Sequence, residues 1–273
     1  MNELDNLLND EKDNNSLLHD FIDGNSTSNP NDIGKLQSQI SATIHTKHAA
    51  TLIQGKQIKV PEAGGKTSQR GVIGLYKFAS IAASMETAIK KDDPFADYIF
   101  YNLHEEIILA RKQMEEKTAH FTKWVKGKIP SNLNLSESLN VRPLKMDLKF
   151  NSAMAFQLTY LILDADKMFR SIKLAQHIAV MDSPQANTNI NDEMRNIRRI
   201  MNTVYLYKTT NATRKDYVQK NQVWARACEL MPNIDLPEEF LNADKRSALA
   251  PFIAIKPEDQ TPEKVKIPEG VAA

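Results

Sequence analysis

One segment, residues 143–150, alternates polar and apolar side chains, whereas the other long segments repeat apolar residues every three to four positions. Strict alternation predicts a β-strand. Its apolar face comprises Leu144, Met146, Leu148 and Phe150, and its polar face comprises Lys145, Asp147 and Lys149. An isolated strand is marginal in water, so this one needs a partner, and a second copy of the chain is the simplest source. The resulting two-stranded ribbon would fit a DNA major groove.

The segments around this strand predict helices. Apolar residues recur with a helical period over residues 72–91, and again over roughly 30 residues that begin at Asp93-Pro94, where Asp caps a helix and Pro suits its first turn. Further helices are expected over residues 192–207 and from Thr213 onward. The predicted fold class is therefore mainly α with a short β-ribbon.

The residues after the strand predict two helices in the order found in a known DNA-binding fold. Asn151-Ser152 offers an N-cap for a buried helix over residues 153–163, and Asp164 is expected to cap a second helix that Ser183-Pro184 stops. Strand, helix, turn and helix over residues 142–182 predict a ribbon-helix-helix-like DNA-binding core inside a larger helical domain. An alternative ribbon is the weakly alternating segment 38–44, which is followed by a basic loop.

Charge divides the chain into three parts. Residues 1–34 hold eight acids and one lysine, which predicts an acidic disordered tail, and residues 251–273 are rich in proline, which predicts a flexible one. Residues 35–250 are then expected to form a single, mostly helical DNA-binding domain. Residues 47–77 carry six basic residues and only Glu62 opposing them, a local excess that attracts phosphates.

Several classes of protein are disfavoured. A single cysteine excludes an internal disulfide framework, and the sequence shows neither a signal peptide nor a membrane-spanning apolar run, so a cytoplasmic protein is expected. His45 and His48 have the spacing of two metal ligands on a helix, but no third ligand is signalled nearby. Because nucleotide-binding and nucleophile motifs are also missing, we expect no enzyme, no cofactor and no metal site.

Several motifs resemble those of a known family. They are His45-Thr46-Lys47-His48-Ala49 with Leu52-x-x-Gly55, Arg70-Gly71-Val72-Ile73-Gly74-Leu75 with Phe78-Ala79, Asp92-Asp93-Pro94-Phe95-Ala96-Asp97, the proline-led strand and aliphatic helix of residues 143–163, and Arg214-Lys215-Asp216. Over residues 36–250 the chain resembles the AcaB family of regulators, which are carried on bacterial conjugative plasmids and integrating conjugative elements. The resemblance implies a DNA-binding activator of conjugative transfer genes with a ribbon-helix-helix-like fold.

We therefore expect a homodimer that binds double-stranded promoter DNA, with RNA polymerase or another regulator as a candidate further partner. The expected DNA contacts are Lys145, Asp147, Lys149, Arg142, Asn151, Lys47 and Arg70. The alternative ribbon would move the site to His45, His48, Lys56 and Lys59. Family members often have arginine at position 47, and lysine keeps the phosphate contact but not a bidentate grip on guanine. The alternative functions are a helical scaffold and a nucleic-acid-processing accessory protein of the conjugation or integration machinery.

Overall fold

The structure is a computed structural model that describes residues 40–56 and 71–254. Its elements, in chain order, are β1 (Ser41–Ile44), α2 (Lys47–Gln54), α3 (Leu75–Lys90), α4 (Pro94–Lys126), β2 (Leu144–Asp147), α5 (Ala153–His177), α6 (Ser183–Asn202), the 3-10 helix η2 (Thr203–Leu206), α7 (Arg214–Gln219), α8 (Gln222–Leu230) and α9 (Glu238–Leu241). The sheet formed by β1 and β2 is two-stranded and antiparallel. The predicted fold class, mainly α with a short β-ribbon, is confirmed.

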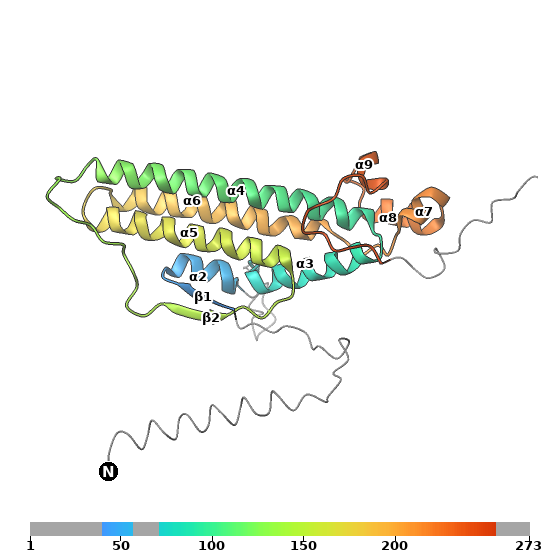
Figure 1. Cartoon of the computed structure of the whole chain (residues 1–273), viewed down its shortest axis with the longest axis horizontal. Helices are drawn as coiled ribbons and strands as arrows, with labels where there is room; N and C mark the ends of the chain where they lie inside the picture. Colours follow the sequence, from blue (N-terminus) through green and yellow to red (C-terminus); the bar gives the residue numbers. More distant parts are fainter. Residues whose placement is uncertain (1–39, 57–70, 255–273) are drawn as a thin grey trace, which may run out of the picture. The chain divides into compact units, whose positions relative to one another are not determined.

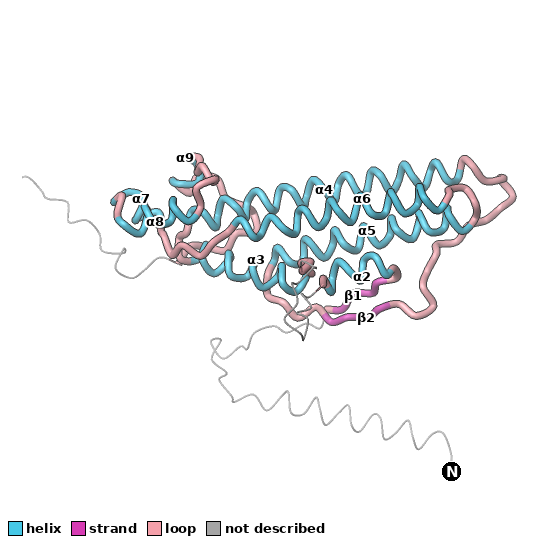
Figure 2. The backbone as a smooth tube through the Cα atoms, turned by 180° about the vertical axis from the view of Figure 1, so that it is seen from behind, coloured by secondary structure: helices cyan, strands magenta, loops and turns pink. Residues whose placement is uncertain are grey.

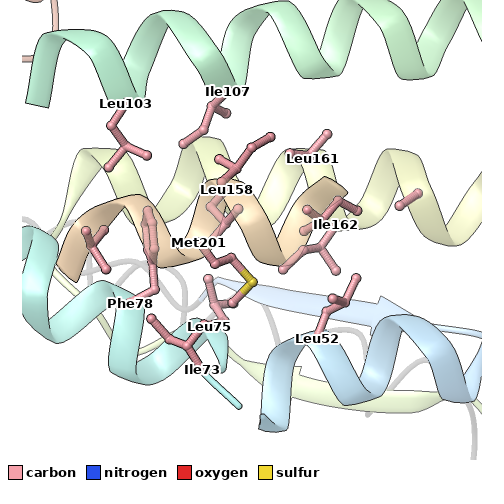
Figure 3. Packing of buried hydrophobic residues seen from close by; sticks show 14 of the residues in the cluster. Leu52, Ile73, Leu75, Phe78, Leu103, Ile107, Leu158, Leu161, Ile162 and Met201 are labelled. Atoms are coloured by element: carbon pink, nitrogen blue, oxygen red, sulfur yellow. The ribbon is translucent and has the colours of Figure 1, made fainter. Parts of the chain in front are cut away.

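Three long helices, α4, α5 and α6, run side by side, and α2 and α3 pack against α5 (Figure 1). The two strands lie along the outer side of α2, as both views show (Figure 2). Apolar side chains of α2, α3, α4, α5 and α6, together with Ile73 just before α3, fill the space between these elements (Figure 3). The labelled members are Leu52, Ile73, Leu75, Phe78, Leu103, Ile107, Leu158, Leu161, Ile162 and Met201, all of them buried. This core explains how α4 is stable at 33 residues, because the chain itself covers its apolar stripe.

The helix starts follow local capping chemistry. The Asp93 carboxylate accepts hydrogen bonds from the backbone N–H groups of Phe95 and Ala96 at the start of α4, as predicted. Ser152 caps α5 by accepting from the Ala155 N–H at 3.3 Å. Thr213 and Asp216 form a reciprocal capping box at α7, which confirms the helix start expected there. These helix starts are therefore encoded in the first turns themselves.

The helix break predicted at Asp164 is wrong. Helix α5 runs without interruption from Ala153 to His177, and the Asp164 carboxylate accepts a hydrogen bond from Nε of Arg111 on α4 at 3.0 Å. Aspartate costs little inside a helix when its charge is paired, and the apolar stripe continues past it through Phe169 and Ile172. Residues 142–182 therefore contain a strand and one 25-residue helix, instead of the two short helices predicted.

The boundary at Ser183-Pro184 also differs from the prediction. These residues do not stop a helix but occupy the first turn of α6, where Asp182 is the N-cap and accepts from the Gln185 N–H at 2.7 Å. Proline is tolerated there because the first N–H groups of a helix have no intrahelical acceptor. Helix α6 thus begins nine residues before the expected residue 192 and ends at Asn202. The helix expected from Thr213 is two helices, α7 and α8, separated at Lys220, whose φ of 49° is left-handed.

Some of the sequence-based predictions fall outside the described residues. The acidic segment 1–34, the two basic residues Lys59 and Arg70, and most of the proline-rich segment 251–273 belong to this group. Residues 251–254 are described, and the Ala254 N–H donates to the Lys90 carbonyl at 2.9 Å.

Candidate nucleic-acid interface

The ribbon forms within one chain. Residues 41–44 pair with residues 144–147 in the register Ser41 with Asp147 and Ile44 with Leu144. The expectation that β2 takes its partner from a second copy is therefore wrong, because β1 fills that place. The two segments predicted as alternative ribbons are in fact the two strands of the same ribbon.

The two faces of the ribbon differ in exposure. Ala42 and Ile44 are buried against the helices, and Met146 is half-buried beside them. The outer face comprises Ser41, Thr43, Lys145 and Asp147, all exposed. Thr43 lies opposite Lys145, and Ser41 lies opposite Asp147, so four polar side chains form one patch across both strands. We call these four residues the ribbon face.

The strand is shorter than predicted, since β2 ends at Asp147 rather than at Phe150. One further ladder hydrogen bond, from the Leu148 N–H to the Ile40 carbonyl at 2.8 Å, continues the pairing. Lys149 and Asn151 are exposed just beyond it, and Phe150 is half-buried against Tyr76 and Phe156. The alternation of exposure therefore persists past the end of the regular strand.

A buried carboxylate fixes the ribbon to the helices. Asp166 on α5 is 2% exposed. Its carboxylate accepts hydrogen bonds from the His45 N–H at 3.2 Å, the Thr46 N–H at 2.8 Å and the Thr46 hydroxyl at 2.7 Å. Nε of Arg170 lies 3.6 Å from the same carboxylate, one helical turn later. The junction between β1 and α2 is thus tied to α5 by charge-assisted hydrogen bonds.

The same junction starts α2. The Thr46 hydroxyl accepts from the Ala49 N–H at 3.2 Å, so it caps the helix while it donates to Asp166. Lys47 is the first residue of α2 and is exposed beside the ribbon. His48 is turned inward, and its ring packs edge-on against Phe169 at 5.9 Å between centroids. Burial, with a smaller contribution from Lys173, lowers the pKa of His48.

His45 is engaged by the connection that precedes β2. Its Nδ1 accepts from the Asn140 N–H at 3.1 Å, and its carbonyl accepts from the Asn140 side-chain amide at 3.0 Å. The Asn140 side-chain oxygen accepts from the Arg142 N–H at 2.9 Å, and the Arg142 side chain is exposed. Asn140 therefore sets the path of the chain into β2 and holds Arg142 near the ribbon.

Two backbone segments cross at the end of α2, one at Gly55 and the other at Gly74. Gly55 ends the helix with a φ of 65°, and a Cβ there would lie 2.5 Å from the Val72 carbonyl oxygen. A Cβ on Gly74 would lie 2.6 Å from the Gly55 nitrogen. Lys56 and Val72 form a β-bridge beside this crossing. The backbone nitrogen of each lies 2.8 Å from the carbonyl oxygen of the other. Both glycines are therefore required by the close approach of two backbones.

The structure brings together most of the predicted contacts that it describes. Lys145, Asp147, Lys149, Arg142, Asn151, Lys47 and Lys56 are exposed on or beside the ribbon and α2. His45 and His48 are half-buried and occupied by contacts within the chain. Residues 40–56 contain no acid, and residues 140–151 contain Asp147 against three cations. This candidate interface therefore carries an excess of positive charge.

Sequence reasoning missed four residues of this region. Ser41 and Thr43 complete the ribbon face, and the alternation over residues 40–44 was their signal. Asn140 and Asp166 hold the ribbon in place from distant positions. No local pattern marks these two, because their partners lie far away in the sequence.

Within residues 40–56 and 71–254, no three histidine, cysteine or acidic side chains are placed to share a metal ion. The same part of the chain has no helix with the length and apolarity needed to cross a bilayer.

Comparison with known proteins gives the family. The model of the family described as "Transcriptional regulator AcaB" matches residues 32–254. The chain belongs to the AcaB family. The crystal structure of selenomethionine-containing AcaB from uropathogenic E. coli is similar to it, with a TM-score of 0.53 and 10% sequence identity over 77% of this chain and 97% of that chain. At that identity the match shows the AcaB fold. No curated protein sequence matches the chain significantly.

Membership of the AcaB family makes the chain a transcriptional regulator, and the family is not a class of enzymes. The structure shows what several of the motifs that resemble AcaB proteins do in the fold. The His45 to Ala49 motif forms the capped junction on Asp166, and Gly55 and Gly74 of two other motifs meet at the backbone crossing.

Proposed function

We propose that this regulator binds promoter DNA sequence-specifically through the ribbon face, and that it activates conjugative transfer genes. The observation that carries the proposal is the exposed, two-stranded polar face, whose opposite side is buried against the helices through Ala42 and Ile44. A two-stranded ribbon fits the major groove, which is about 12 Å wide. The role in conjugative transfer comes from the resemblance to AcaB regulators.

The ribbon face has the chemistry for reading bases. Lys145 can donate to guanine, Asp147 can accept from the cytosine amino group, and Ser41 and Thr43 can do either. Lys145 and Thr43 are cross-strand neighbours, so they would address adjacent positions in the groove. This mixture of donors and acceptors suits recognition of a particular sequence better than a uniformly basic surface does.

Exposed cations around the ribbon face suit contacts with phosphates. Lys47, Arg142 and Lys149 are exposed beside it, and none of them has a carboxylate partner within the described part of the chain. Each phosphate that they neutralise releases counterions, so the logarithm of affinity should fall by about 0.9 per contact for each unit of log salt.

We propose further that the active form is a homodimer. Since each chain already supplies a complete two-stranded ribbon, a dimer would carry two ribbons and would occupy two major grooves. On one side of the duplex, successive major grooves are about 34–36 Å apart. The expected operator is therefore two half-sites separated by about one helical turn, or a multiple of it.

The test is DNA binding by the full chain to promoter fragments taken from upstream of transfer genes. We expect a footprint of two half-sites, lost in Lys145→Ala/Thr43→Ala and retained in Lys90→Ala/Lys91→Ala, two exposed lysines at the end of α3. Binding that survives the ribbon variant and is lost with Lys47→Ala/Lys56→Ala would move the interface to α2. A single half-site occupied by a monomer would contradict the dimer.

A scaffold function is the alternative if the chain binds no DNA. Its support is a pair of exposed apolar residues on α4, Ile108 and Leu109, which are 45% and 55% exposed. Such neighbouring apolar groups are typical of protein contacts. Capture of a protein partner by the full chain that is lost in Ile108→Ser/Leu109→Ser, together with no DNA binding at low salt, would favour this alternative.

A further inference from the structure

A second concave site lies away from the ribbon. A cleft of about 1080 Å³ opens between the C-terminal half of α4, the C-terminal half of α5 and the connection that leads from α4 to β2. Small-molecule sites usually fall between about 300 and 1000 Å³, so this cleft has room for an organic ligand. No part of the ribbon face lines it.

The floor of the cleft is apolar. Phe121 and Val125 of α4, Leu135 of the connection and Leu174 of α5 line it. Val125 is buried, and the other three are half-buried, so their remaining surface faces the space of the cleft or its margin. Apolar surface left partly open in a cleft is where a ligand gains most from displacing water.

The rim of the cleft is cationic. Six lining residues are basic and three are acidic, which gives a net charge of +3. Arg111 is paired with Asp164, and Arg170 with Glu137. Lys123, Lys126 and Lys167 are exposed and have no carboxylate partner among residues 40–56 and 71–254. These three lysines are available to an anion.

Arg170 connects the cleft to the ribbon. Its Nη1 lies 3.4 Å from Glu137 on the connection, and its Nε lies 3.6 Å from Asp166, which holds the β1–α2 junction. That Nε is buried and has no hydrogen-bond partner within the described residues. Arg170 therefore bridges the connection and the ribbon anchor, and an anion in the cleft could compete with the exposed Glu137 for its Nη1.

We propose that this cleft binds an organic anion with an apolar body, such as an aromatic or aliphatic carboxylate or sulfonate. The apolar body lies on Phe121, Leu135 and Leu174, and the acid group lies among Lys123, Lys126 and Lys167 within reach of Arg170. Because the ligand would compete with Glu137 for Arg170, its binding changes the position of the connection that enters β2. The effect on DNA affinity rests on the proposed function, whereas binding of the anion does not.

The binding test uses 1-anilinonaphthalene-8-sulfonate as the anionic probe and N-phenyl-1-naphthylamine as its uncharged counterpart. Titration of the full chain should show saturable binding of one sulfonate per chain, with weaker binding of the uncharged probe. In Lys123→Gln/Lys126→Gln/Lys167→Gln the dissociation constant of the sulfonate should rise at least tenfold. It should be unchanged in Lys90→Gln/Lys91→Gln/Lys208→Gln, three exposed lysines outside the cleft.

Equal affinity in the two triple variants, or no saturable binding, would overturn the proposal. Loss of DNA binding in the cleft variant without any probe binding would also overturn it, because the cleft would then be a DNA contact. If the sulfonate binds as expected, the DNA affinity should shift when the probe is saturating, and this shift should vanish in Arg170→Gln. Sulfonate binding without any DNA binding would retain the site and refute the proposed function instead.

Discussion

Among single residues, Asp166 does the most to hold the candidate interface in place. A buried carboxylate needs compensation, and this one receives two backbone N–H groups, one hydroxyl and a nearby guanidinium. All three hydrogen bonds come from the two residues that join β1 to α2. The position of the ribbon therefore depends on one side chain of a helix that contributes nothing to the ribbon face.

Replacing Asp166 with alanine should lower the free energy of unfolding by about 3 kcal/mol, because it leaves the donors of His45 and Thr46 without their acceptor and Arg170 without one of its two carboxylates. Urea denaturation measures this loss. Asp182→Ala is the matched control, since that aspartate caps α6 at an exposed position and should cost only about 1 kcal/mol. An Asp166→Ala variant as stable as the control would show that the junction does not depend on this carboxylate.

Because of His48, the free energy of unfolding should depend on pH. Burial lowers its pKa, so the unfolded chain takes up a proton at this histidine more readily than the folded chain does. The free energy of unfolding should therefore fall as the pH drops below about 6.5, the usual value for histidine. In His48→Gln this fall should be smaller, whereas His120→Gln, an exposed site on α4, should keep it. Urea denaturation between pH 7 and pH 5 is the measurement, and identical slopes in all three proteins would contradict the argument.

Among the helices and strands, the sequence predicts helix starts well and tertiary pairings poorly. Asp93, Ser152 and Thr213 act within one turn of their own helix, so their caps were predictable. Asp164 has the same capping chemistry, but Arg111 pairs with it from α4 and α5 continues through it. The strand at β2 was predictable from its alternation, whereas its partner was not, because β1 is separated from it by three helices, α2, α3 and α4.

The close approach of the backbones at Gly55 and Gly74 can be tested by a single substitution. Gly74→Ala would place a Cβ 2.6 Å from the Ile53 carbonyl oxygen and from the Gly55 nitrogen, and neither backbone can move freely. We expect a loss of more than about 1 kcal/mol in the free energy of unfolding. Gly127→Ala is the control, because a Cβ there meets nothing closer than 3.6 Å and φ is −73°. A Gly74→Ala variant with unaltered stability would show that the two backbones do not approach so closely.

A buried ion cluster joins the C-terminal helices to α4. Asp97 is fully buried and accepts from Arg214 at 2.8 Å and from Arg246 at 2.8 Å. Arg214 also donates to Asp92 and to the Phe240 carbonyl, and Arg246 donates to the Pro251 carbonyl. Two motifs that resemble the AcaB family, at residues 92–97 and 214–216, thus meet in space although they lie far apart in sequence.

Asp97→Ala should therefore destabilise the chain by about 3–5 kcal/mol, since two arginines lose a buried partner. It should also expose the segment after residue 214 to protease, which mass spectrometry of a limited digest would detect. Asp192→Ala removes an exposed ion pair with Arg195 and should change stability by less than about 1 kcal/mol. Equal effects of the two substitutions would refute a structural role for the cluster.

Tethered cleavage of DNA can show whether the ribbon face enters a major groove. An iron chelate is attached to Val141→Cys in a Cys228→Ser background, since Val141 is 96% exposed beside the ribbon but outside the ribbon face, and Cys228 is the chain's single, exposed cysteine. Attachment at Lys126→Cys, on the rim of the cleft, is the comparison. We predict DNA strand breaks focused on one major groove of each half-site for position 141 and none for position 126. Breaks from position 126 alone would contradict the assignment of the ribbon as the DNA-binding face.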